Sequence, residues 1–288
     1  MTGIEVTPGG VCAMIHADGG LGRPTLRGSN AMNARRFYAF PGFLAGLMAV
    51  VALAMSPSAR VFAEDGPEAA SGPVVVELFT SQSCSSCPPA DRLLGKLAER
   101  PDVIAMSLPV DYWDHLQWED TLGRSEHSER QRIYARQLGL ANVYTPQMVV
   151  NGIKNVIGSH SEAVEQAIRA ARKSASPVPV RLEMEGDGFT VRLGPAKPGA
   201  AATEAAVLVV PLLSARTVDI KRGENRGKTI TYHNVSREIR QVGTWRGEET
   251  ALTLTHDEVM TGDADRCAVI LQDTHSGAIL GAALLEDA

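Results

Sequence analysis

The most informative stretch of the chain is residues 74–91, which read VVVELFTSQSCSSCPPAD. Its first six residues form a short, largely apolar run after Gly72-Pro73, a pattern typical of a strand. From Pro88 onward, apolar side chains recur at helical spacing, and prolines are tolerated only in the first turn of a helix. The sequence therefore places Cys84 and Cys87, a Cys-x-x-Cys pair, where a strand passes into a helix.

The same alternation of strands and helices continues to about residue 175. Asn151-Gly152 is a strong hairpin signal and predicts that the last two strands of this region are antiparallel. Ser159 is suited to cap the last helix. The predicted order is β-α-β-α-β-β-α, in which the elements after the first helix are a strand at 103–110, a helix at 125–138, strands at 147–150 and 154–157, and a helix at 159–171.

This order, with Cys-x-x-Cys at the first strand-to-helix junction, resembles the thioredoxin fold. The resemblance covers residues 73–175 and includes Thr145-Pro146, just before the third strand. More narrowly, residues 78–91 and 110–114 are similar to an exported bacterial family of thioredoxin-like proteins with a domain of unknown function (DUF1223). The resemblance implies an α/β thioredoxin-like domain and export, and it supplies no substrate.

Residues 178–288 show a different pattern, with eight short strand-like runs separated by turn signals. Strands at this spacing predict an all-β, sandwich-like domain after the thioredoxin-like one. Cys267 lies in an apolar run and is expected to be a buried free thiol. The polar segment 223–228 is interpreted as a solvated hairpin loop, with contact to the first domain or to a partner as the alternative.

The first 63 residues are expected to lie outside the fold. Arg35-Arg36 precede the uncharged apolar run 43–55, and small residues follow, so residues 32–63 read as a cleaved signal peptide. An uncleaved anchor is the alternative. Residues 1–31 are interpreted as a non-native or disordered extension. These expectations predict a periplasmic or secreted protein that has no membrane association after cleavage.

Composition narrows the function classes. The chain has 288 residues and a net charge of −5, which becomes −8 when residues 1–63 are removed. A nucleic-acid partner needs a basic footprint, so none is predicted. Four cysteines are too few for a disulfide-stapled scaffold. The sequence contains no P-loop and no G-x-G-x-x-G motif, and no cofactor is predicted.

The Cys-x-x-Cys pair has the spacing that thiol–disulfide exchange requires. A helix N-terminus lowers the pKa of the first thiol, so Cys84 is the expected nucleophile and Cys87 the resolving thiol. Ser85 and Ser86 are expected to donate hydrogen bonds to the thiolate. The expected partners are protein thiols or disulfides.

The resemblance to thioredoxin-like proteins implies two further roles. Glu77 would lie beneath the disulfide and relay a proton to Cys87, and the alternative is a strand carboxylate that faces solvent. The Thr145-Pro146 peptide bond would be cis and would present its backbone to a substrate peptide. The alternative is a trans proline that opens a strand.

Polar and aromatic residues follow the second predicted strand. Strand ends of this kind face the ligand crevice in open α/β sheets, so these residues are expected beside the cysteines. Tyr112 and Trp113 are predicted to bind substrate, with Asp111, Asp114 and His115 around them. The alternative is that the aromatic rings pack under the loop 112–124 and the acids cap the next helix. His127, His160 and His233 show no ligand spacing and are predicted to lie at the surface.

Three functions remain open at the level of sequence. The first is an exported protein, and possible enzyme, that performs thiol–disulfide exchange through Cys84 and Cys87. The second is a copper-type metal-binding module that uses the same thiolates and His115; the leading hypothesis includes no metal site. The third is a non-catalytic binding protein in which the Cys-containing unit is only a scaffold.

Overall fold

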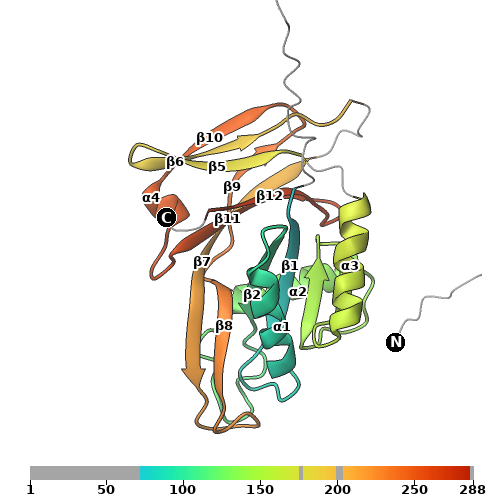
Figure 1. Ribbon diagram of the computed structural model, residues 1–288, viewed down its shortest axis with the longest axis vertical. Coiled ribbons are helices and arrows are strands. Elements are labelled where there is room, and N and C mark those ends of the chain that lie inside the picture. The colour runs from blue at the N-terminus through green and yellow to red at the C-terminus, as the bar shows by residue number, and fades with distance from the viewer. Residues whose placement is uncertain (1–71, 175–177, 199–203, 286–288) are drawn as a thin grey trace, which may run out of the picture. The chain divides into compact units, whose positions relative to one another are not determined.

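The computed structural model describes residues 72–174, 178–198 and 204–285. The predicted extension 1–31 and signal peptide 32–63 lie outside these residues. In the described part of the chain, no helix is long and apolar enough to cross a membrane. The elements are helices α1 (Pro88–Ala98), α2 (Ser125–Gln137), α3 (Ser161–Ser174) and α4 (His256–Val259), and strands β1 (Val74–Thr80), β2 (Val103–Pro109), β3 (Gln147–Val150), β4 (Lys154–Ile157), β5 (Val180–Glu185), β6 (Gly188–Leu193), β7 (Ala205–Asp219), β8 (Thr229–Ser236), β9 (Arg240–Trp245), β10 (Thr250–Thr255), β11 (Arg266–Asp273) and β12 (Ile279–Leu285) (Figure 1).

Most of the predicted elements lie where the local patterns place them. Elements β1 to α3 follow the expected order, and Asn151 and Gly152 form the turn between β3 and β4 with φ angles of 46° and 72°. Positive φ at both central residues is the requirement of a type I′ hairpin turn, which Asn-Gly meets at low cost. Local sequence therefore accounts for the elements themselves.

The predicted fold class, an α/β thioredoxin-like domain followed by an all-β sandwich-like domain, is wrong. The described chain is mostly β, and strands from both halves form one nine-stranded mixed sheet in the order β12-β11-β7-β8-β2-β1-β3-β4, with β9 also paired to β7. The halves join where Ser107 of β2 pairs in parallel with Val235 of β8. The expectation failed because local patterns predict strands and do not specify which strands pair.

The join at β2 satisfies groups that would otherwise be buried without partners. Every residue of β2 is buried, so its backbone on the side away from β1 cannot rely on water. Strand β8 covers this side, and the Asn234 side chain donates a hydrogen bond of 2.9 Å to the carbonyl oxygen of Ala105. The second half of the chain thus completes the hydrogen bonding of the first.

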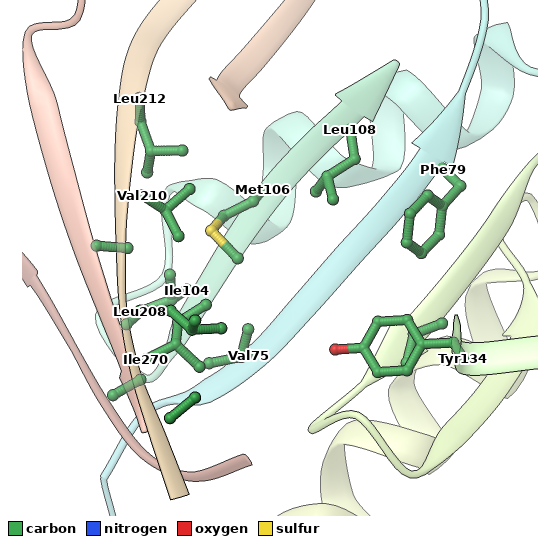
Figure 2. Close-up of a cluster of buried hydrophobic side chains, with 14 of the residues drawn as sticks. Val75, Phe79, Ile104, Met106, Leu108, Tyr134, Leu208, Val210, Leu212 and Ile270 are labelled. Atoms are coloured by element: carbon green, nitrogen blue, oxygen red, sulfur yellow. The ribbon is translucent and has the colours of Figure 1, made fainter. Parts of the chain in front are cut away.

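One face of β1 and β2 packs against strands from the far end of the chain. Val75 and Met106 lie in a single buried cluster with Leu208 of β7 and Ile270 of β11, and Tyr134 of α2 closes one side of it (Figure 2). The opposite face of the same strands packs against α1 and α3 through a separate cluster. Strands β1 and β2 are therefore covered by helices on one face and largely by strands on the other.

The long strand β7 is shared between two cores. Alternate side chains of a strand point to opposite faces, and Leu208 accordingly lies in the cluster with Met106 while Val207 and Val209 pack toward Phe189 of β6. The small sheet β10-β6-β5 covers this second face. Such face-to-face packing of two sheets is the part of the predicted sandwich that the structure contains.

Because the core is shared, a destabilising substitution in the second half of the chain should destabilise the first half as well. We expect Ile270→Ala, which creates a cavity at a fully buried position, to lower the free energy of unfolding by about 2–5 kcal/mol. Urea denaturation followed by circular dichroism should show one transition, with the amides of β1 and β2 losing protection against hydrogen exchange together with those of β11. Ile157→Ala, at a side chain that is 44% exposed, serves as control. Protection lost only in β11 would contradict a common core.

Candidate functional site

Cys84 and Cys87 form a disulfide between the end of β1 and the start of α1. Their Cα atoms are 5.4 Å apart, and Cys87 is the residue that caps the helix, directly before Pro88. Both cysteines are buried, and the exposed fraction is 6% for Cys84 and 0% for Cys87. The neighbouring side chains of Ser85 and Ser86 are exposed, and the Ser86 Oγ lies 3.3 Å from the Cys84 Sγ.

The loop 112–124 is fastened to the residues that precede Cys84. The backbone N–H of Gln82 donates to the Asp120 carboxylate at 2.7 Å, and the Gln82 side-chain oxygen accepts from the Trp118 ring N–H at 2.8 Å. The Ser83 hydroxyl donates to the carbonyl oxygen of Trp118 at 2.7 Å. These contacts hold the approach to the disulfide in one conformation.

A second clamp on the disulfide loop comes from the distant turn between β7 and β8. Asn225 is fully buried, and its side-chain amide donates to the carbonyl oxygens of Gln82 at 2.9 Å and Cys84 at 2.8 Å. The Lys228 ammonium donates in turn to the Asn225 side-chain oxygen at 2.8 Å. The segment 223–228 lies in the hairpin between β7 and β8, and most of its residues are exposed, as predicted. Its one buried residue, Asn225, makes the contact with the Cys-containing region that was the alternative.

The predicted substrate-binding residues lie together. The Thr145-Pro146 peptide bond is cis, which confirms the expectation drawn from the resemblance. The Trp113 ring N–H donates to the Thr145 hydroxyl at 2.8 Å, and the Tyr112 and Trp113 ring centroids are 5.7 Å apart. The rings of His115 and Trp113 are stacked, with their centroids 6.3 Å apart. Tyr112, Trp113 and Thr145 are half-buried, so each presents part of its surface to solvent.

The predicted polar neighbours of this aromatic group mainly support the backbone. Asp111 accepts a hydrogen bond from the hydroxyl of Ser128 in α2, and Asp114 accepts from the backbone N–H of Asp120. His115 is exposed and lies 3.0 Å from the carbonyl oxygen of Tyr112. Within residues 72–174, 178–198 and 204–285, no three His, Cys, Asp or Glu side chains are grouped so that they could hold a metal ion.

Glu77 is fully buried, so the alternative of a solvent-facing strand carboxylate is wrong. It lies on the face of β1 that bears Val75 and Phe79, whereas α1 packs on the face that bears Val76 and Leu78. Its two carboxylate oxygens accept hydrogen bonds from the Arg130 guanidinium at 2.6 Å and from the Tyr134 hydroxyl at 2.5 Å. Glu77 thus takes part in a buried ion pair across the sheet from the helix that begins at Cys87.

A different carboxyl group lies on the same helix as Cys87. Asp91 is 2% exposed, one of its oxygens accepts from the Thr80 hydroxyl at 2.8 Å, and the other has no hydrogen-bond partner in the described part of the chain. Burial raises the pKa of Asp91 to about 7. Burial also raises the pKa of Asp120 to about 6. The pKa of Tyr232 is raised as well, mainly by burial and further by the negative charges of Asp91 and Asp120.

The histidines were predicted to lie at the surface, and for His127 this is wrong. His127 is fully buried at the start of α2, and its Nδ1 lies 2.8 Å from the carbonyl oxygen of Pro109. Burial lowers its pKa to about 4, which keeps the ring neutral at physiological pH. His160 is exposed and His233 is half-buried.

Sequence reasoning missed Asp91, Asp120 and Asn225 as site residues. For Asp91 a signal was present, because it follows Cys87 by four residues in a helix and so shares its face. For Asn225 the sequence offered only the alternative that the polar segment 223–228 contacts the first domain, and it did not single out this residue, which contacts a residue 141 positions away. The Cys267 thiol is buried and free, as expected, and burial raises its pKa to about 12.

The Asn225 clamp predicts a measurable contribution to stability. Asn225→Ala removes a donor from two carbonyl oxygens, those of Gln82 and Cys84, and leaves Cys84 only the backbone N–H of Cys87. This loss should cost about 1–3 kcal/mol of the free energy of unfolding. Urea denaturation measures this loss, and amide hydrogen exchange should quicken in residues 81–87. The exposed neighbour Glu224, replaced by Ala, is the control. Equal effects of the two substitutions would contradict the clamp.

The raised pKa of Asp91 predicts a dependence of stability on pH. A carboxyl group whose pKa rises from 3.8 to about 7 on folding binds its proton more tightly in the native state. Its stabilisation is therefore complete below pH 3.8 and is lost as the pH rises through 7. Between pH 3.8 and about 7, the free energy of unfolding of the wild-type chain should fall by on the order of a few kcal/mol relative to that of Asp91→Asn.

The comparison with Asp91→Asn also separates this effect from that of His127. The lowered pKa of His127 gives the opposite slope, because stability rises as the pH increases from about 4 to 6.5. Both chains carry His127, so its contribution cancels in the difference between their urea unfolding curves. A difference that does not change with pH would contradict the assignment for Asp91.

Comparisons with known proteins identify the family. The X-ray crystal structure of protein AGR_C_4864 from Agrobacterium tumefaciens is 36% identical in sequence, with a TM-score of 0.66 over 74% of this chain and 93% of that chain. HBP35 of Porphyromonas gingivalis shares the fold alone, at 12% identity and a TM-score of 0.51 over 75% of each chain. No curated protein matches. A family model matches residues 75–272, and the chain therefore belongs to the family described as Protein of unknown function (DUF1223).

Proposed function

We propose that the protein exchanges disulfides with protein thiols through Cys84 and Cys87. The observation that carries this proposal is a disulfide at a helix N-terminus whose two residues differ in burial, with 6% of Cys84 and 0% of Cys87 exposed. The exposed Ser85 and Ser86 lie directly beside Cys84. In exchange chemistry, one sulfur must meet the substrate while the other stays protected within reach of it.

The reaction follows from this arrangement. A substrate thiolate attacks the Cys84 Sγ, the Cys84–Cys87 bond breaks, and its electron pair passes to the Cys87 Sγ. A second substrate thiolate then attacks the substrate sulfur of the mixed disulfide and releases the Cys84 thiolate. The substrate dithiol is oxidised by two electrons and the protein is reduced by two, and the reverse sequence reduces a substrate disulfide.

Two features of the surroundings support Cys84 as the attacking thiolate. The Ser86 hydroxyl lies within hydrogen-bond distance of its Sγ, and the aligned peptide dipoles of α1 give the N-terminal end of the helix partial positive charge. Both stabilise a thiolate relative to a thiol. The proposal assigns contact with the substrate peptide to Tyr112, Trp113 and Thr145, which are half-buried and of which the last two are hydrogen-bonded to each other.

Export is part of the same proposal. Disulfides persist in oxidising compartments outside the cytoplasm, and the segment 32–63 has the order of charge, apolar residues and small residues that a signal peptide has. The predicted location is the periplasm or the extracellular medium.

The proposal predicts that Cys87→Ser traps substrates. Without the resolving thiol, mixed disulfides on Cys84 cannot be broken from within the protein and should accumulate. Peptide-level mass spectrometry after thiol blocking in cells should find partner cysteines joined to Cys84. The double variant with both Cys84 and Cys87 replaced by Ser is the matched control, because it keeps Cys267, the remaining cysteine after residue 63. A Cys87→Ser variant that carries no more mixed disulfide than this control would overturn the proposed function.

A further inference from the structure

Asp91 and Cys87 occupy one face of the first turns of α1. The backbone N–H of Asp91 donates to the carbonyl oxygen of Cys87 at 3.1 Å, the regular hydrogen bond of an α-helix. Side chains four residues apart in a helix are neighbours, with Cβ atoms about 5–6 Å apart. Both side chains are buried, so the space they share is protected from solvent.

The surroundings of Asp91 leave one carboxyl oxygen without a hydrogen-bond donor in the described residues. Thr80, the last residue of β1, donates to the other oxygen. The titratable and charged groups that face this part of α1 are Asp120 from the loop 112–124, Tyr232 and His233 from β8, and Arg92 from α1 itself. The Tyr232 hydroxyl is likewise buried and has no partner among the described residues.

These surroundings favour a protonated carboxyl group. An ionised oxygen that is buried without a donor is costly, whereas a proton on it removes the charge. Burial and the negative charge of Asp120 raise the pKa of Asp91 to about 7, against the lowering effect of the Thr80 hydrogen bond. A group that gains and loses a proton near neutral pH is suited to general acid–base work.

Glu77, the carboxylate that the resemblance implied for this role, is placed differently. Both of its oxygens are bonded, to Arg130 and to Tyr134, and it lies on the opposite face of β1 from α1. A proton exchanged by the buried Cys87 has a nearer acceptor on its own helix.

We propose that Asp91 donates a proton to Cys87 and accepts one from it during disulfide exchange. The inference rests on the proposed function. When a substrate thiolate attacks Cys84, the sulfur of Cys87 leaves with the electron pair of the broken bond and takes the proton of the Asp91 carboxyl group, which becomes a carboxylate. In the reverse direction, the carboxylate accepts the proton of the Cys87 thiol while its sulfur attacks Cys84 and displaces the substrate thiolate.

The two steps can be followed separately with a chromogenic disulfide. The full chain with Cys12→Ser is reduced, freed of reductant and mixed with dithio-bis-nitrobenzoate in a stopped-flow instrument. Attack by Cys84 releases a first coloured thiolate, and attack by Cys87 on the resulting mixed disulfide releases a second. In the wild-type background, the rate of the second release should increase as the pH rises through about 7.

Asp91→Asn should slow the second release by about 100-fold or more at neutral pH, because general acid–base catalysis contributes about 10²–10⁴-fold. The plot of its rate against pH should also lose the inflection near pH 7. The first release should keep its rate. Thr80→Val removes the hydrogen bond to Asp91 and should move the inflection to higher pH, which keeps the inference testable if Asp91→Asn does not fold. Glu77→Gln should leave the second release unchanged.

The outcomes separate the inference from the function on which it rests. Absence of the first release in the wild-type background would overturn the proposed function. In another outcome, the first release is normal while Asp91→Asn and Thr80→Val leave the second release unchanged. That result would overturn the role of Asp91 and leave the proposed function intact. A second release that depends on Glu77 and not on Asp91 would assign the proton to the carboxylate on the other face of the sheet.

Discussion

The rest of the structure depends on burying the apolar face that β1 and β2 turn away from α1. This face carries Val75 and Met106, and α2 covers only part of it through Tyr134. The remaining cover comes from β7 and β11, which lie more than 100 residues later in the chain. Burial of apolar side chains is the main favourable term in folding. The two halves of the chain therefore share one core and one large sheet.

The same joining of the two halves builds the surroundings of the disulfide. Because β8 pairs with β2, the β7–β8 hairpin brings Asn225 against the backbone of Gln82 and Cys84. The loop 112–124 reaches the same backbone from the other half through Asp120 and Trp118. In this loop, which is bound from both sides, Cys84 is 6% exposed and Cys87 is fully buried, and the proposed function rests on this difference.

Two buried carboxyl groups show how position determines chemistry. Glu77 is neutralised by the Arg130 guanidinium, so it serves an ion pair that ties β1 to α2. Among the described residues Asp91 accepts a hydrogen bond from the neutral Thr80 hydroxyl and none from a cation, and burial raises its pKa to about 7. The two side chains differ by one methylene group. Their roles differ because Glu77 faces the Arg130 guanidinium on one side of the sheet, whereas Asp91 faces Asp120 and Tyr232 on the other side.

Residues close together in the chain, or a recognisable motif, account for the strands and helices, the disulfide pair at the start of α1 and the cis bond at Thr145-Pro146. The pairing of β2 with β8, the ion pair of Glu77 and the contact of Asn225 with the disulfide loop depend instead on the tertiary structure. Strand pairing and burial depend on contacts between segments far apart in the sequence. Periodicity shows that a strand has an apolar face and does not show what will cover it.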